Sequence, residues 1–141
     1  DGNNPQWVGL RFQNLPIPPG ATIKNAWIQF QADEAWSIPT SVTFQGELNP
    51  NPGTFTSAAF GISSRTRTSA TATWTPVAWN TVGEAGDPQR TPSLTAIVQA
   101  LVNQPGWNAG NAMVFLATRS ATRTAESFDG GSPAALLHIE Y

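Results

Sequence analysis

The sequence predicts an all-β fold, an antiparallel β-sandwich with one covering α-helix, and three observations lead to this class. Short segments alternate apolar with polar residues, as the two faces of a β-strand require. Clusters rich in proline, glycine and asparagine separate these segments and mark turns. A single segment instead repeats its apolar residues at the spacing of one helical face. At 141 residues the chain suits one domain over residues 1–141.

Two segments near the start of the chain predict the first two strands. Residues 8–12 and 26–30 each place their apolar side chains on one face, so each strand has one face to bury. The prolines and Gly20 between them cannot lie in a central ladder and therefore mark a turn. We expect the two strands to pair as a hairpin across this turn.

Later segments complete the predicted sandwich. Residues 42–48 and 69–74 alternate in polarity and predict strands with one face open to water. Residues 113–117 are apolar on both faces, which is typical of a covered central strand. Residues 134–141 alternate again and predict the last strand. We expect seven or eight strands in total.

The one predicted helix covers residues 92–104. Thr91 is suited to cap its N-terminus and Pro92 to occupy its first position, whereas residues 103–106 end it. We expect the helix to cover an open end or edge of the sandwich. The apolar residues that share its face are Leu94, Ile97, Val98, Leu101 and Val102.

Composition narrows the classes of function. Charged residues make up 11% of the chain, well below the roughly 25% of typical soluble domains, and such polar, weakly charged surfaces are typical of exported β proteins. We therefore expect an extracellular protein, either secreted or on the cell surface. The net charge of −2 gives no general attraction to nucleic acid or to an anionic membrane. No apolar run approaches the length of a membrane span.

The first residues predict that the chain is part of a longer secreted protein. Residues 1–5 resemble a loop, and the chain has neither an initial methionine nor a signal-like apolar segment. A further strand would normally close a sandwich before this loop. We therefore expect a vacant edge beside the strand that begins at Trp7 or beside its partner.

Both ends of the chain resemble the DNRLRE-type carbohydrate-binding domains, which are jelly-roll modules of secreted bacterial and archaeal proteins. The resemblance rests on residues 9–12 (GLRF), 19–23 (PGATI) and 26–28 (AWI), and on residues 127–128 (SF) and 132–141 (SPAALLHIEY). It implies a jelly-roll-like sandwich. It also implies a non-catalytic module that holds an enzyme or adhesin on a polysaccharide, or a stalk-like domain of a surface protein.

Six tryptophans against one tyrosine suggest sugar-binding platforms, because aromatic faces pack on the C–H faces of sugar rings. Trp36 follows an acidic pair in a loop and Trp79 follows a proline, so we expect both at the surface as stacking residues. The alternative is a place in the core, which we expect for Trp107 beneath the helix end. Trp7 and Trp27 point to the opposite face of their strands from the regular apolar residues. This position fits either a sheet whose second face is also covered or a side chain exposed to water.

Arg65 and Arg67 share one face if their segment is extended. Their planar guanidinium groups suit the carboxylates of uronates or the sulfates of acidic glycans. The alternative is pairing within the protein, with Glu47, Glu126 or Asp129 as the acidic partners.

A structural calcium ion is the one cofactor that the sequence suggests. Asp33, Glu34 and Asp129 are its candidate ligands, because calcium prefers clustered oxygen ligands. No EF-hand loop is present. Asp33 and Glu34 can act together only where the strand has ended, since adjacent residues of a strand point to opposite faces.

We expect the protein not to be an enzyme. His138 is the only histidine and lies within the last predicted strand, and the chain has neither cysteine nor a Gly-x-Ser-x-Gly motif. Polysaccharide binding is therefore the leading hypothesis. The alternative is a structural subunit or stalk of an extracellular filament or surface layer, in which neighbouring domains or protomers complete an open strand edge.

Overall fold

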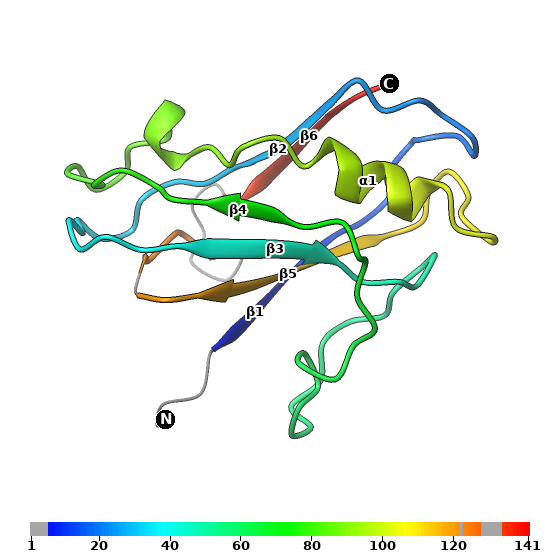
Figure 1. Cartoon of the computed structure of the whole chain (residues 1–141), viewed down its shortest axis with the longest axis horizontal. Helices are drawn as coiled ribbons and strands as arrows, with labels where there is room; N and C mark the ends of the chain where they lie inside the picture. Colours follow the sequence, from blue (N-terminus) through cyan, green and yellow to red (C-terminus); the bar gives the residue numbers. More distant parts are fainter. Residues whose placement is uncertain (1–5, 122, 128–133) are drawn as a thin grey trace.

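A computed structural model of the chain confirms an antiparallel β-sandwich with a single short α-helix (Figure 1). The structure describes residues 6–121, 123–127 and 134–141. The first sheet has the strand order β1-β5-β3-β4, and the second sheet pairs β2 with β6. The bounds are β1 (Trp7–Phe12), β2 (Asn25–Gln29), β3 (Val42–Gly46), β4 (Ala72–Trp74), α1 (Thr95–Val102), β5 (Met113–Arg119) and β6 (Leu136–Glu140).

The predicted hairpin between the first two strands is wrong. β1 pairs with β5 in the first sheet, whereas β2 pairs with β6 in the second. The connecting segment crosses between the sheets because it is anchored in the core. Ile17 is buried there, and its carbonyl oxygen accepts a hydrogen bond of 3.0 Å from the indole nitrogen of Trp107. Apolar side chains of both strands nevertheless pack against the same core, across it rather than side by side.

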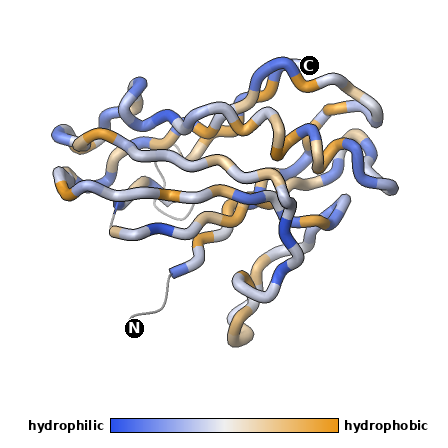
Figure 2. The backbone as a smooth tube through the Cα atoms, in the orientation of Figure 1, coloured by the Kyte–Doolittle hydropathy of each residue, from blue (hydrophilic) through white to orange (hydrophobic). Residues whose placement is uncertain are grey.

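The strands are fewer and shorter than expected. The described residues form six strands, and the predicted segments 42–48 and 69–74 shrink to β3 and β4. The central strand is confirmed, because β5 lies between β1 and β3 and its first five residues are buried. Figure 2 shows apolar and polar residues distributed along the tube. The apolar side chains from both sheets and α1 meet in one core.

α1 begins later than predicted because Thr91 has another role. The side-chain oxygen of Thr91 accepts a hydrogen bond of 3.0 Å from the main-chain nitrogen of Ile28, and its own nitrogen donates to the oxygen of Ile28. Thr91 therefore extends the second sheet beside β2, and Leu94 occupies the N-cap position. The predicted apolar face is buried. It packs on β2 and β3, so the helix contacts a strand of each sheet.

The loop between β3 and β4, residues 47–71, lies over part of the outer face of the first sheet. The ring of Phe55 lies directly on Gly9, where an added Cβ atom would be 2.4 Å from Cζ of the ring. Only glycine fits this contact. The loop thus covers one end of the sheet and leaves the other end uncovered by it (Figure 1).

No helix in the described ranges is long and apolar enough to cross a membrane.

Candidate functional site

A row of hydroxyl groups crosses the outer face of the first sheet. Trp7 in β1 lies opposite Thr118 in β5, Thr118 lies opposite Thr43 in β3, and Thr43 lies opposite Thr73 in β4. Directly opposed residues of an antiparallel sheet share a face, so the four side chains stand side by side. We call Thr118, Thr43 and Thr73 the threonine row. None of the three is buried.

The sequence forms this face because threonine suits both requirements of an exposed strand position. Its β-branched side chain favours the extended backbone, and its hydroxyl group remains in contact with water. The next pair outward is Ser41 and Ser120. The main-chain nitrogen of Ser41 donates a hydrogen bond of 2.9 Å to the hydroxyl oxygen of Ser120, and the nitrogen of Ser120 donates one of 3.0 Å to the carbonyl oxygen of Ser41. The uncovered end of the sheet therefore presents several hydroxyl groups on its outer face.

Trp7 also forms one wall of an open groove of about 310 Å³. The other wall is the part of the β3–β4 loop that contains residues 56–58 and 60–63. The lining combines the indole ring and Phe60 with the hydroxyl groups of threonine and serine. An aromatic surface beside a few polar groups is the usual lining of a small-ligand site.

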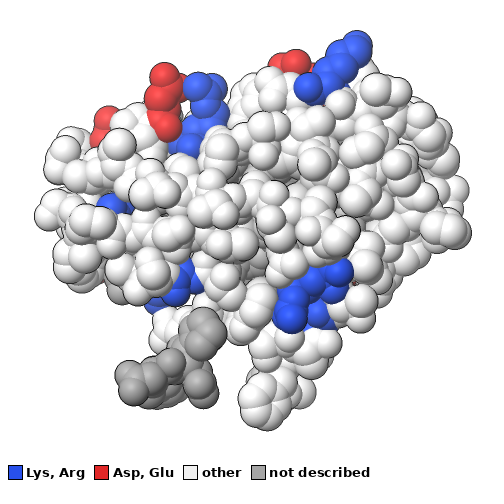
Figure 3. All heavy atoms as spheres, viewed as in Figure 1, with Lys and Arg blue, Asp and Glu red and all other residues white. Residues whose placement is uncertain are grey.

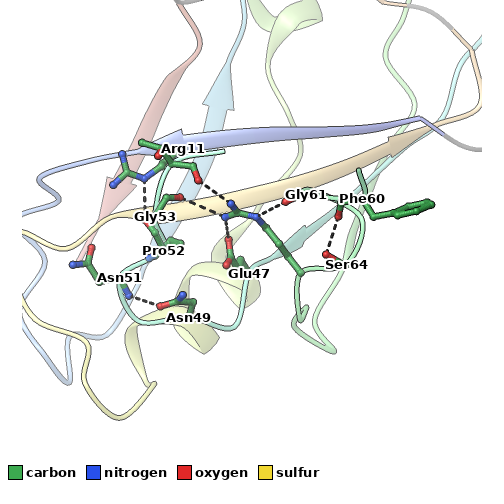
Figure 4. A network of polar contacts seen from close by, with 11 residues as sticks. Arg11, Glu47, Asn49, Asn51, Pro52, Gly53, Phe60, Gly61 and Ser64 are labelled. Atoms are coloured by element: carbon green, nitrogen blue, oxygen red, sulfur yellow. Dashed lines mark hydrogen bonds and ion pairs between the residues drawn. The ribbon is translucent and has the colours of Figure 1, made fainter. Parts of the chain in front are cut away.

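Phe60 is held at the mouth of this groove in an unfavourable backbone conformation. Its φ is +62°, in the left-handed region that bulky residues rarely adopt, and 75% of the residue is exposed. Ser64 fixes the turn, because both its nitrogen and its hydroxyl group donate to the carbonyl oxygen of Phe60. Figure 4 shows the Phe60 ring directed away from the polar network behind it. Strained, exposed aromatic residues of this kind are typical of functional sites.

Arg65 is at the centre of that network and holds the loop together. Its Nη1 atom lies 2.5 Å from Oε2 of Glu47, and its Nε and Nη2 atoms donate to the carbonyl oxygens of Gly61 and Thr54. The guanidinium group also lies 4.6 Å from the centre of the Phe55 ring. Arg65 therefore pairs within the protein, with Glu47, as the alternative prediction states, and its nitrogens bond to groups of the protein.

Arg67, the other predicted arginine, lies against Trp7. Its Cζ atom is 4.4 Å from the centre of the indole ring, a typical cation–π distance. Nη1 donates a hydrogen bond of 2.8 Å to the carbonyl oxygen of Ser63, which belongs to the groove wall. The structure thus brings one predicted ligand-binding residue to the groove.

The two predicted stacking tryptophans lie at one end of the sandwich, paired through their main chains. The expectation that Trp79 is exposed is wrong, because only 1% of this residue is accessible. Its ring packs near Trp74, and Pro88 accepts the hydrogen bond of its indole nitrogen. The ring of Trp79 therefore lies in the interior and cannot stack on a sugar. Trp36 is half-buried, and its indole nitrogen donates to Oε2 of Glu34 at 2.9 Å.

The candidate calcium ligands are not assembled in the described part of the chain. Glu34 accepts hydrogen bonds from the hydroxyl group of Thr124 and the indole of Trp36, and these bonds lower its pKa. Within residues 6–121, 123–127 and 134–141, no three acidic or histidine side chains come together as a metal site. Asp129 lies outside these ranges. A calcium site with Asp33, Glu34 and Asp129 therefore stays a prediction.

The outer face of the second sheet carries a half-buried tryptophan, Trp27, but its ring is covered. The Trp27 ring stacks on His138 with 3.8 Å between centroids, and Arg90 lies 5.3 Å from its centre. β6 and the segment that contains Arg90 pair with opposite edges of β2, so both faces of Trp27 have neighbours. His138 also contacts Glu140 at 2.9 Å. This face therefore offers no free indole platform.

The sequence did contain a signal for the threonine row. Threonine or serine occupies every second position over residues 69–75, and the same spacing recurs at Ser41 and Thr43 and at Thr118 and Ser120. Their register across the strands brings them together, and that register depends on pairings between distant segments. Alternation alone cannot show it.

Comparison of the chain with family models, curated proteins and solved structures found no match. The resemblance to DNRLRE-type domains therefore stays a prediction, and the functional argument rests on the site itself.

Proposed function

We propose that this protein is a non-catalytic carbohydrate-binding module of a secreted or cell-surface protein, and that it binds polysaccharide on the outer face of the first sheet. The observation that carries the proposal is the alignment of Trp7 with the threonine row. A sugar ring offers an apolar C–H face to an indole and hydroxyl groups to other hydroxyl groups. This sheet face supplies both kinds of contact.

The dimensions of the row suit a polymer rather than a single sugar. Neighbouring strands are about 4.8 Å apart, so the three intervals between β1 and β4 span roughly 14 Å. A chain of several sugar rings can therefore lie across the strands. The groove between Trp7 and Phe60 extends this surface at the β1 edge.

The chemistry of the threonine row suits binding and not catalysis. Hydroxyl groups and an indole ring do not titrate near neutral pH, so they supply neither a general acid nor a general base. Each neutral hydrogen bond contributes only about 1 kcal/mol. Several such contacts along a repeating polymer are needed for useful affinity.

Substitutions in the row test the proposal. Trp7→Ala should reduce adsorption to a bound polysaccharide about tenfold or more, and Thr43→Val or Thr118→Val should each reduce it roughly fivefold, the equivalent of one hydrogen bond. Valine keeps the shape and the strand preference of threonine, so the melting temperature should change little. Affinity electrophoresis in gels that contain a panel of polysaccharides measures the effect.

Two control variants test whether the loss of adsorption is specific to the threonine row and Trp7. Trp27→Ala removes a tryptophan from the other sheet, and Thr22→Val removes an exposed hydroxyl group from a loop. Both should leave adsorption unchanged. Equal losses in the control and row variants, or no adsorption of the parent protein, would contradict the proposal.

A specific observation also favours the alternative function as a structural subunit of an extracellular assembly. β1 is an edge strand of the first sheet. Outward-facing main-chain groups on such a strand are a template for pairing with another chain. Molar mass measured over a concentration series tests this second candidate.

A further inference from the structure

We infer that the polysaccharide bound at this face is acidic, and that Arg67 binds its carboxylate or sulfate groups. This inference rests on the proposed function and adds the chemical class of the ligand. It starts from the contrast between Arg65 and Arg67, two arginines of one loop with different surroundings.

Arg67 keeps most of its hydrogen-bonding capacity for a ligand. Within the described residues its guanidinium group makes one hydrogen bond, from Nη1 to Ser63, and no ion pair. Its other nitrogens are not among the fully buried atoms that lack a partner, so they retain some contact with solvent. Arg65, by contrast, is bonded to Glu47 and to several carbonyl oxygens.

The position of Arg67 matches the proposed glycan site. Its guanidinium group lies on Trp7, the residue at which the threonine row meets the groove. Contact with the indole ring holds the guanidinium group in place, because the ring face attracts the cation. A sugar that packs in the groove would therefore place its substituents near a fixed arginine.

The charge around the groove favours an anion. The residues that line the groove include no aspartate or glutamate, and Glu47, in the same loop, is neutralised by Arg65. In the view of Figure 3, the visible acidic side chains lie at the upper border beside basic ones, whereas the lower half shows basic side chains and no acidic ones. An acidic polymer would meet no unpaired carboxylate among the groove residues.

A guanidinium group and a carboxylate or sulfate form two parallel charge-assisted hydrogen bonds, which are stronger than bonds between neutral groups. We therefore expect acidic polymers to bind at least tenfold more tightly than a neutral one. Their binding should also weaken as salt is added, since ions screen contacts at a solvent-exposed site.

The test compares adsorption of the whole chain to three polymers: polygalacturonate, which carries carboxylates, dextran sulfate, and uncharged dextran. Arg67→Gln should lose about tenfold in affinity for the acidic polymers and little for dextran. Arg67→Lys keeps the charge but not the planar fork, so it should recover only part of the loss. Arg90→Gln, which removes an exposed cation from the other side of the sandwich, should bind as the parent does.

The outcomes separate the inference from the proposed function. Equal, salt-independent binding to all three polymers would overturn the acidic ligand and leave carbohydrate binding standing. An unchanged affinity of Arg67→Gln for the acidic polymers would overturn the role of Arg67. Binding to none of the three would overturn both proposals. Preference for polygalacturonate or for dextran sulfate identifies which acidic group the site accepts.

Discussion

Glu34 joins two loops at one end of the sandwich through its carboxylate. Its Oε2 atom accepts a hydrogen bond of 2.7 Å from Thr124 and one of 2.9 Å from the indole of Trp36. Both bonds favour the ionised carboxylate and so lower its pKa below the ordinary value of 4.5, with Thr124 as the larger cause. The two loops are thereby linked by a group that loses its charge in acid.

The lowered pKa gives a testable dependence on pH. A carboxylate whose pKa is lower in the folded than in the unfolded protein stabilises the fold above the unfolded value. That stabilisation is lost as pH falls through the folded value. NMR titration of the Glu34 carboxylate should give a midpoint below 4.5, and Thr124→Val should move it upward. Ser37→Ala in the same exposed loop is the control, and an unchanged midpoint in Thr124→Val would contradict this account.

Tryptophan positions show how far single residues could be predicted. Trp107 is buried beneath the helix end as the sequence indicates, because a regular apolar face precedes it. Trp79 follows a proline in an irregular segment, where no periodicity shows which way a side chain points. Trp7 lies opposite an apolar face, which is compatible with either burial or exposure. Its role at the groove depends on the distant loop that forms the other wall.

At the scale of elements, local patterns predict strands and helices better than their partners. The alternation in β1 and β2 is the same whether the two strands pair with each other or face each other across a core. The crossing depends on the burial of Ile17 and on its hydrogen bond from Trp107, a contact between residues far apart in the chain. The helix start depends likewise on Thr91 pairing with β2.

The apolar face of α1 gives the clearest prediction at this scale. Ile97→Asp or Leu101→Asp should unfold the protein or lower its melting temperature severely, because each would place a charge in the core without a partner. Ala96→Asp is the matched control, since Ala96 is exposed on the same helix. Circular dichroism during heating measures the difference. A buried variant that melts like Ala96→Asp would show that the helix does not pack as described.

At the scale of the molecule, β1 leaves one edge of the first sheet open. Alternate residues of an antiparallel strand direct their main-chain groups to the same neighbour. The nitrogen of Glu47 donates to the oxygen of Val114, so the even-numbered residues of β5 face β3 and the odd-numbered ones face β1. Their partners in β1 are its even-numbered residues. The main chains of Trp7, Gly9 and Arg11 therefore point outward, and no described residue bonds to them.

This edge is suited to pairing with a second copy. If two β1 strands met in antiparallel fashion about Gly9, each Trp7 would lie opposite an Arg11 and each Val8 opposite a Leu10. The first pair suits a cation–π contact, and the second would bury Val8, which is 43% exposed although it belongs to the apolar face. If the vacant edge expected from the sequence is filled by a second copy, this pairing about Gly9 is the register that we expect.

Val8→Lys tests whether the edge assembles, because a lysine on an edge strand opposes pairing with another chain. The parent protein should increase in mean molar mass as its concentration rises, and Val8→Lys should remain closer to a monomer, as light scattering measures. Val82→Lys, at a valine that is 62% exposed in a distant loop, should associate as the parent does. A parent protein that is monomeric throughout the series would rule out self-pairing of β1, because the open edge would then have no partner among its own copies.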